Sequence, residues 1–296
     1  MKKESENNNH LKIGELPDLR VLHIDSLVFH EDPDEGRLLN LVSRLGSEGI
    51  LKNPPIVAAA DRGQRFIILD GANRITALKK LKFDNIPVQV VSPDDPDLEI
   101  RCWHHAIEKL DKDYFLRNIS TMPGIRLIRV DTEQAVRNSD DSECNPEHAR
   151  DGYLCQLIFE SGEIFAAFNG GNLLEQLGHL KKITDLYLDT PHSDRVSYTN
   201  LNHLKINYPE FRTLITFRRL CLSEVEDIVM AGRKLPAGIT RVLLPKRALG
   251  LNIRLEFLKS DLTLDEKNRW LTEMIHKMVL AKAIRFYQEP TFRFDE

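Results

Sequence analysis

The sequence predicts an α+β fold, with a small N-terminal α/β module, a mixed α/β C-terminal lobe and a C-terminal helix. Two observations predict it. Between residues 20 and 91 the apolar pattern gives the order strand, helix, hairpin, helix, strand. Near the other end, the capping box Thr263-x-x-Glu266 opens a long helix that we expect to run to about Phe286.

In the N-terminal part, each element follows from apolar spacing and from the Gly and Pro residues that interrupt it. Residues 1–18 are mostly polar and predict a flexible leader. We place the first module at residues 19–110 and the C-terminal lobe at residues 111–296. The predicted elements of the module are a strand at 20–27, a helix at 35–45, a hairpin of strands 56–59 and 66–69, a helix after Asp70-Gly71, and a strand at 86–91.

The remaining sequence is less regular, and the same criteria apply to it. We expect helices at 97–110, at 173–186 and from the N-cap Ser223 to 231. A polar, turn-rich loop is expected at 137–150. The predicted strands are 126–130, a hairpin of 154–159 and 164–168, and then 239–244 and 253–257.

Composition limits the class of protein. The chain has 296 residues, 42% of them hydrophobic, and a net charge of -4, which is unlike a chain built to coat DNA or an anionic membrane. No secretory signal and no membrane span is apparent, so we expect a cytoplasmic protein without a membrane partner. The four cysteines lack Cys-x-x-Cys spacing, and we expect buried thiols in a reducing cytosol.

One motif carries a chemical prediction: Asp70-Gly71-Ala72-Asn73-Arg74, between a predicted strand and helix. The first backbone N–H groups of a helix have no partner within it, and the helix dipole places partial positive charge there. Gly71 permits a tight turn or a close approach, and Arg74 is able to fork onto phosphate oxygens. The motif thus predicts an anion site, although an ordinary turn with Asp70 as the helix cap explains the same residues.

Residues 21–91 resemble the ParB/sulfiredoxin-like superfamily, whose members carry Gly-x-x-Arg at this strand–helix junction and use it on nucleotide phosphates. The similarity is greatest to the free L-serine kinases, both the archaeal ADP-dependent enzymes and the bacterial enzymes of siderophore biosynthesis. The blocks that carry it are His30-Glu31, Gly49-Ile50-Leu51-Lys52-Asn53-Pro54-Pro55-Ile56-Val57, Leu69-Asp70-Gly71-Ala72-Asn73-Arg74 with Ala77-Leu78, Trp103-His104-His105, and Leu235-Pro236-Ala237-Gly238-Ile239-Thr240-Arg241.

The resemblance implies a nucleotide-dependent phosphotransferase that acts on free L-serine or a similar small hydroxylated acceptor, gives O-phosphoserine, and uses ATP or ADP with Mg²⁺. It implies Glu31 as the catalytic base, and Asp70 as a catalytic residue that holds magnesium or steers the acceptor. The implied nucleotide-binding residues are Gly71, Ala72, Asn73 and Arg74, and the implied substrate-binding residues are Trp103, Thr240 and Arg241.

Two departures from the family pattern leave alternatives open. Ala72 and Asn73 replace two histidines, and Val242 replaces a third. A family member that binds nucleotide without catalysis is one alternative. A ParB-like regulator or partition protein that binds DNA is another, less favoured because no pair of short helices with a basic recognition face is apparent. Taken without the resemblance, the sequence favours Glu31 as a solvated acid in an acidic loop and Trp103 as a core residue.

Overall fold

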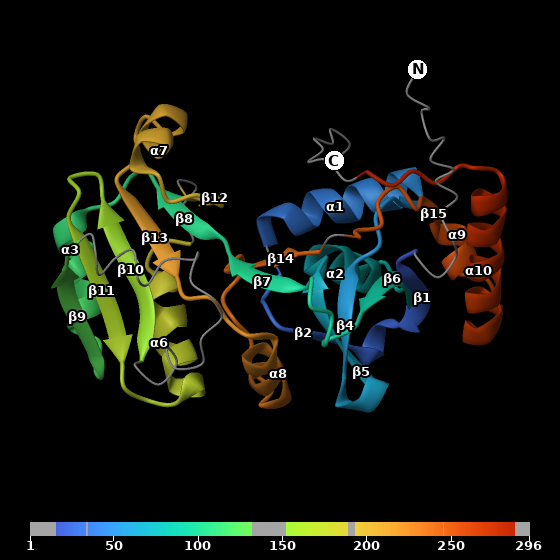
Figure 1. Cartoon of the computed structure of the whole chain (residues 1–296), viewed down its shortest axis with the longest axis horizontal. Coiled ribbons are helices and arrows are strands. Elements are labelled where there is room, and N and C mark those ends of the chain that lie inside the picture. Colours follow the sequence, from blue (N-terminus) through green and yellow to red (C-terminus); the bar gives the residue numbers. More distant parts are fainter. Residues whose placement is uncertain (1–15, 34, 132–151, 189–192, 245, 288–296) are drawn as a thin grey trace, which may run out of the picture.

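A computed structural model describes residues 16–33, 35–131, 152–188, 193–244 and 246–287. It confirms the α+β fold class: a five-stranded and a six-stranded sheet lie side by side (Figure 1). Between them lie β7 (Glu99–Cys102), β14 (Thr240–Leu243) and α8 (Leu222–Met230). The loop predicted at 137–150 and residues 1–15 of the predicted leader lie outside the described residues. The boundary between the two predicted domains stays a prediction.

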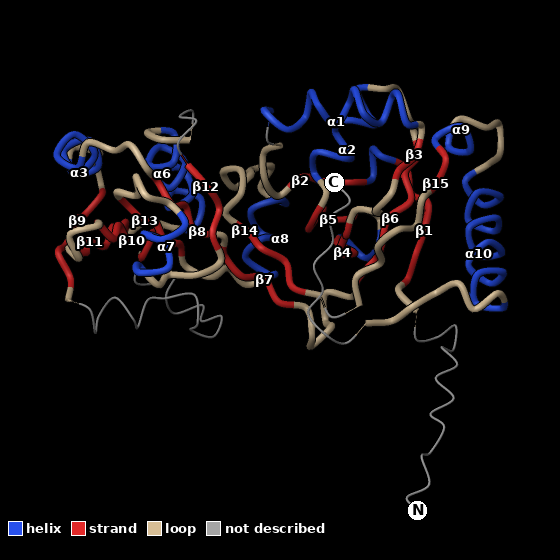
Figure 2. Tube along the Cα trace, turned by 90° about the horizontal axis from the view of Figure 1, so that it is seen from above, coloured by secondary structure: helices blue, strands red, loops and turns tan. Residues whose placement is uncertain are grey.

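The first sheet has the strand order β1-β6-β4-β5-β2. β4 and β5 form the predicted antiparallel hairpin, while β2 runs parallel to β5 and β4 runs parallel to β6. Helices α1 and α2 lie together over one face (Figure 2). The elements are β1 (Asp18–His23), β2 (Leu27–Phe29), α1 (Glu35–Glu48), β4 (Ile56–Ala60), β5 (Arg65–Asp70), α2 (Ala72–Lys80) and β6 (Asn85–Val91), with 3-10 turns at Ile24–Ser26 and Asp61–Gly63.

Both faces of this sheet are buried. Val57 and Ile68 face the core that α1 and α2 cover, whereas their neighbours Ile56 and Ile67 face a second core with residues of α8 (Leu222–Met230). Alternate residues of a strand point to opposite faces, so a strand covered on both sides is apolar throughout. This explains the continuous apolar runs of β4 and β5 in the sequence.

The C-terminal segment returns to the first sheet. β15 (Ile253–Arg254) pairs with β3 (Ile50–Leu51), and α10 (Leu264–Leu280) packs beside β1 (Figure 1). The side chain of Asn268 bonds both backbone groups of Val21, its Oδ1 accepting at 2.8 Å and its Nδ2 donating at 2.9 Å. The far end of the chain therefore completes the N-terminal core.

The structure corrects two boundaries in this segment. The predicted strand 253–257 is a strand only at β15, because Leu255 and Leu258 of the short helix α9 (Leu255–Leu258) both turn into the core. The capping box at Thr263 is confirmed, but α10 ends at Leu280 instead of Phe286, two residues before Lys282 at φ 53°.

The second sheet has the order β12-β8-β13-β10-β11-β9. The predicted hairpin β10–β11, the strand β9 and the helix α6 are confirmed. Its elements, with the connecting ones, are β7 (Glu99–Cys102), β8 (His104–Ile107), α3 (Lys112–Ser120), β9 (Ile125–Val130), β10 (Tyr153–Phe159), β11 (Ile164–Asn169), α6 (Leu173–Asp185), β12 (Ser193–Val196), α7 (Leu201–Asn207), β13 (Thr213–Phe217) and β14 (Thr240–Leu243).

The helix predicted at 97–110 is wrong, because this stretch forms the strands β7 and β8. In β7, buried Ile100 and Cys102 alternate with the partly exposed Glu99 and Arg101, which is the period of a strand. β8 is buried at all four positions, so it shows no alternation that the sequence could reveal. Between them, β7 pairs with β14 and β8 joins the second sheet, so this stretch links the two halves of the molecule.

Two smaller expectations are also corrected. The N-cap of α8 is Cys221, not Ser223, because the Glu224 carboxylate accepts the Cys221 N–H at 3.0 Å. Cys102 and Cys155 are the expected buried thiols, whereas Cys221 is disulfide-bonded, a pairing that local spacing does not signal. Among the described helices, none has the length and apolar character needed to cross a membrane.

Candidate functional site

A cavity of about 690 Å³ lies between the first sheet and the segment that precedes β14. It brings together most of the residues predicted for the site: Glu31, Asp70, Gly71, Ala72, Asn73, Arg74, Trp103 and Thr240. Arg241 does not line it. Sequence reasoning missed several other lining residues, namely His30, Asp32, Asn40, Arg44, Arg195 and Gly238.

The backbone around Glu31 is fixed by a bridge between the two halves of the chain. Leu235 donates its N–H to the His30 carbonyl oxygen at 2.7 Å, and Asp32 donates its N–H to the Leu235 carbonyl oxygen at 3.3 Å. Glu31 lies between these two bonds. Its position therefore depends on a segment more than two hundred residues away in sequence.

The Glu31 carboxylate receives three hydrogen bonds from that same segment. Oε2 accepts the Gly238 N–H at 2.9 Å, and Oε1 accepts the N–H and the hydroxyl of Thr240 at 2.5 and 2.6 Å. The side chain is 12% exposed. A carboxylate has about four lone-pair directions on its two oxygens, so these donors leave one direction, on Oε2, for a ligand.

The His30 side chain links Thr240 to the first sheet through its two ring nitrogens. One ring nitrogen, Nδ1, bonds the Ile68 carbonyl oxygen, and the other, Nε2, lies 2.6 Å from Thr240 Oγ1. Nε2 also lies 3.9 Å from Glu31 Oε1. The pair His30-Glu31 and Thr240 thus form one connected cluster at the edge of the cavity.

A second histidine holds the opposite side of the Gly238 segment. His105 Nε2 lies 3.0 Å from the Gly238 carbonyl oxygen and donates to it, so Nδ1 accepts the Tyr187 hydroxyl at 2.8 Å. Burial lowers the pKa of His105 to about 4, with the nearby positive charge of Arg195 acting in the same direction. A neutral ring is what this pattern of one donor and one acceptor requires.

Asp70 is held by two arginines. Its Oδ2 accepts from Arg74 at 3.1 Å and from Arg247 at 2.8 Å. Burial alone would raise the pKa of the Asp70 carboxyl. The charges of Arg74 and Arg247, with hydrogen bonds from Arg74 and the Gly71 N–H, outweigh burial and hold that pKa below its usual range. Asp70 is therefore ionised at neutral pH and is not the side-chain cap of α2.

The turn from β5 into α2 is tightly packed. Gly71 is the N-cap, at φ 97°, and no described side chain caps the helix. A Cβ at this position would lie 2.8 Å from Pro55 Cβ and 3.1 Å from Arg74 Nη2. The turn therefore needs glycine both for its conformation and for its contacts, and the residues of the first helical turn line the cavity.

Arg74 is anchored to backbone as well as to Asp70. Its Nη1 donates to the carbonyl oxygens of Asn53 at 2.9 Å and Pro54 at 3.2 Å. The Arg74 side chain, 17% exposed, is thus part of the cavity wall. Anchoring of this kind orients the fork before a ligand arrives and reduces the conformational entropy lost on binding.

Trp103 and Arg241 act as a pair. The backbone N–H of Trp103 donates to the Ile239 carbonyl oxygen at 2.8 Å, and the Arg241 guanidinium lies 5.0 Å from the centre of the Trp103 ring. Trp103 lines the cavity, whereas Arg241 stacks on the ring from outside the lining. The ring therefore presents an apolar surface whose position Arg241 stabilises.

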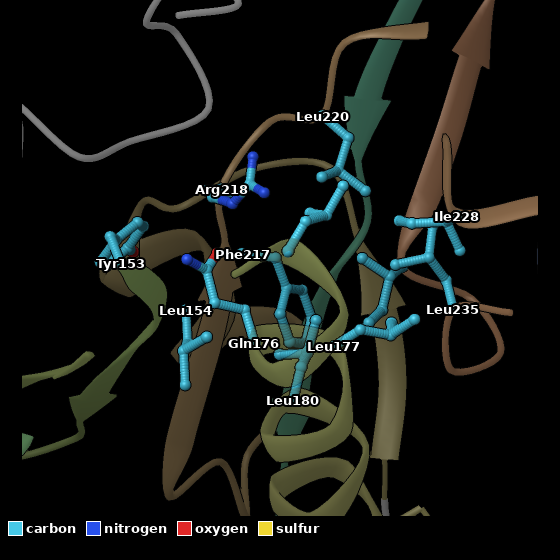
Figure 3. Close-up of a pocket in the computed structure, with 12 residues that line it drawn as sticks. Tyr153, Leu154, Gln176, Leu177, Leu180, Phe217, Arg218, Leu220, Ile228 and Leu235 are labelled. Carbon is cyan, nitrogen blue, oxygen red and sulfur yellow. The ribbon is translucent and has the colours of Figure 1, made fainter. Parts of the chain in front are cut away.

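A second hollow, where α6 meets α8, is unsuited to a substrate. Its volume is about 20 Å³, and apolar side chains such as Leu177, Leu180 and Ile228 surround it (Figure 3). That volume is close to the space one water molecule needs. The functional chemistry is accordingly assigned to the large cavity.

In the described part of the chain, no three His, Cys, Asp or Glu side chains gather as metal ligands. Magnesium in phosphoryl-transfer sites is commonly held by one or two carboxylates together with substrate phosphates. A single carboxylate at Asp70 fits that type of site, and both arginine contacts are made to Oδ2.

No family model matches the sequence. The sequence is 23% identical over 288 residues to the ATP-dependent L-serine kinase SbnI of Staphylococcus aureus, covering 94% of this chain and 97% of that protein. It is 29% identical over 87 residues to an ATP-dependent L-serine kinase of Staphylothermus marinus, covering 29% of this chain and 34% of that one.

Solved structures extend this likeness to the fold. C-terminally truncated SbnI superposes with a TM-score of 0.64 at 21% identity, covering 88% of this chain and 97% of that one. A free serine kinase in complex with AMP gives a TM-score of 0.64 at 20% identity, covering 82% and 94%. These comparisons confirm the resemblance to the free serine kinases, and the chain has their fold.

Proposed function

We propose, from the fold this chain shares with the free serine kinases, that it transfers the terminal phosphoryl group of ATP or ADP to the hydroxyl of free L-serine or a similar small acceptor. One observation carries the proposal. The carboxylate of Glu31 and the uncapped N-terminus of α2 with Arg74 line the same cavity. A proton acceptor and a phosphate cradle within one enclosure are the parts that phosphoryl transfer needs.

The nucleotide phosphates would bind at the start of α2. The N–H groups of Ala72 and Asn73 and the fork of Arg74 supply donors and positive charge there. Both Ala72 and Asn73 act in this proposal through their backbone, so the replacement of the family's histidines leaves the cradle intact. Gly71 lets the phosphates approach the backbone closely.

The acceptor hydroxyl would be oriented by Glu31. Oε2 has one lone-pair direction left by its donors, and we assign the proton transfer to that atom. In the step, the hydroxyl proton passes to Oε2, the acceptor oxygen bonds to the terminal phosphorus, and the bond from that phosphorus to the bridging oxygen breaks with its electron pair on the nucleotide. Thr240 fixes the carboxylate, and Trp103, supported by Arg241, would form the apolar wall beside the acceptor.

Magnesium would arrive with the nucleotide, and Asp70 is the residue we propose to hold it. The ion would supply neutralisation of the phosphate charge. Asp70 has a further role that needs no metal, because it ties Arg74 to Arg247 and so fixes the phosphate-binding fork.

The test is phosphorus NMR of the purified protein with magnesium, L-serine, and ATP or ADP. We expect O-phosphoserine from the wild type and a rate about 10²- to 10⁴-fold lower from Glu31→Gln, the usual contribution of a general base. Glu256→Gln, whose side chain is 77% exposed and lies outside the cavity lining, is the matched control. Product formation at wild-type rate by Glu31→Gln, with ADP binding unchanged, would refute the assignment of the base.

A further inference from the structure

The charged side chains of the cavity wall are paired, with one clear exception. Asp70 is paired with Arg74 and Arg247, and Asp32 lies 3.3 Å from Lys234. Arg44 also lines the cavity, from α1, and its guanidinium has no hydrogen-bond or ion-pair partner anywhere in the described ranges. A cation in the wall of a binding cavity that no protein group neutralises is suited to an anion from solution.

Asn40, the neighbour of Arg44 on α1, supports an anion site at this wall. Asn40 lies one helical turn earlier, also lines the cavity, and its amide likewise has no partner among the described residues. Leu41, which also lines the cavity, is apolar. The wall formed by α1 therefore presents a guanidinium fork and an amide next to each other, beside a small apolar surface.

This combination has a definite ligand chemistry. A guanidinium binds planar or tetrahedral oxyanions through two parallel N–H bonds, and an adjacent amide adds a further donor. We propose that Arg44, with Asn40, binds an oxyanion of the substrates, either the carboxylate of the acceptor or a phosphate of the nucleotide. The identity of these two ligands rests on the proposed function.

The arrangement of the walls favours the carboxylate. The phosphates already have the N-terminus of α2 and Arg74. Glu31, the residue proposed to meet the acceptor hydroxyl, precedes α1 by a few residues, and Glu31 and Arg44 line the same cavity. Arginine side chains on a helix lean toward its N-terminus, which is the end of α1 where Glu31 lies. Arg44 would then select acceptors that carry a carboxylate beside the hydroxyl.

Calorimetric titration of the full chain tests this without relying on turnover. The probes are ADP, O-phospho-L-serine, and phosphoethanolamine, which lacks only the carboxylate. We expect Arg44→Gln to weaken O-phospho-L-serine binding about 10- to 100-fold, as for a lost hydrogen bond to a charged group, and to leave phosphoethanolamine nearly unchanged. Arg44→Lys keeps the charge without the fork and should lose part of the affinity.

The matched control is Arg254→Gln, which removes the same charge at a side chain that is 75% exposed and outside the cavity. A loss confined to ADP would support the site and identify the phosphate as its anion. If Arg44→Gln changes none of the three affinities more than Arg254→Gln does, the site is overturned. If the wild type binds ADP but forms no O-phosphoserine, the proposed kinase activity is refuted, and the effect of Arg44→Gln on ADP binding still tests the anion site. If the wild type binds none of the three probes, both the proposed function and the anion site are overturned.

Discussion

Replacing Gly71 by alanine separates two requirements that this position places on its residue. The backbone at φ 97° disfavours any residue with a Cβ, by about 1–2 kcal/mol. The added Cβ would also lie 2.8 Å from Pro55 Cβ, closer than carbon atoms tolerate, so the β5–α2 turn must shift. Overpacking of this kind typically costs about 1–3 kcal/mol. We therefore expect Gly71→Ala to lower the free energy of unfolding by roughly 2–5 kcal/mol in all.

The chain offers two matched controls for this substitution. Gly232, after α8, has φ 67° but open space around a built Cβ, so Gly232→Ala should show the backbone term alone, about 1–2 kcal/mol. Gly46, inside α1, has ordinary helical backbone and open space, and Gly46→Ala should stabilise by about 0.5–1 kcal/mol. The order Gly71, Gly232, Gly46 is thus predicted from conformation and contact.

The assay is urea unfolding followed by tryptophan fluorescence, with ADP binding measured on the same samples. Gly71→Ala should also weaken ADP binding, because the new methyl group lies 3.1 Å from Arg74 Nη2 and at the proposed phosphate cradle. Gly232→Ala should bind ADP normally. A Gly71→Ala protein that is no less stable than Gly232→Ala would refute the argument from close packing, and normal ADP binding by a folded Gly71→Ala would refute the cradle.

Two further predictions concern the ion pairs of Asp70 and the buried hydroxyl of Tyr187. Because the folded-state pKa of Asp70 is lowered, its charge contributes stability that is present at neutral pH and is lost as pH falls through that pKa. The difference in stability between wild type and Asp70→Asn should therefore be largest near pH 7 and vanish in acid. Urea midpoints measured from pH 7 to pH 3 check this. Tyr187→Phe removes the hydroxyl donor to His105 Nδ1 and leaves a buried nitrogen without a partner, which should cost about 1–3 kcal/mol in thermal unfolding.

Each of these has a clear contrary result. A difference between wild type and Asp70→Asn that does not change with pH would mean that the ion pairs with Arg74 and Arg247 contribute nothing through the charge of Asp70. A Tyr187→Phe protein as stable as the wild type would mean that the hydroxyl is dispensable to the network behind Gly238.

The parts of the fold that were predicted are those with a local signal. The hairpin β4–β5, the turn at Gly71 and the capping box at Thr263 each depend on residues close together in sequence, so apolar spacing and turn chemistry suffice to predict them. The strand His104–Ile107 was missed because all four of its residues are buried, so it lacks the alternation that distinguishes a strand, and the neighbouring strand Glu99–Cys102 alternates over only four residues.

In the candidate site, too, only the residues with a local sequence signal were predictable. Asp70, Gly71 and Arg74 carry a motif whose physical logic is local. The partners of Glu31 are not local: its donors come from Gly238 and Thr240, and only the folded chain brings them to it. Arg247, on Asp70, gives no local signal in the sequence either.

The position of Arg44 in the cavity wall could not be predicted from the sequence, for a different reason. Arg44 falls within a predicted helix, but its orientation toward the cavity depends on which face of α1 the sheet buries. Leu38 and Leu45 are buried, whereas Asn40 and Arg44 are not, so the apolar stripe predicts which face points inward but not what the other face meets. The cavity opposite that face is a property of the assembled molecule.

The return of the C-terminal segment to the first sheet has a consequence for biosynthesis. Val21 and Asn268 are separated by 247 residues, so the ribosome delivers β1 long before the helix that packs on it. At typical translation speeds of about 5–20 residues per second, the apolar surface at β1 stays uncovered for roughly 12–50 s until α10 has been synthesised. Any nascent chain that stalls before α10 exposes that surface to chaperones and proteases. The core beside the large cavity is thus closed only in chains whose synthesis has gone to the end of α10.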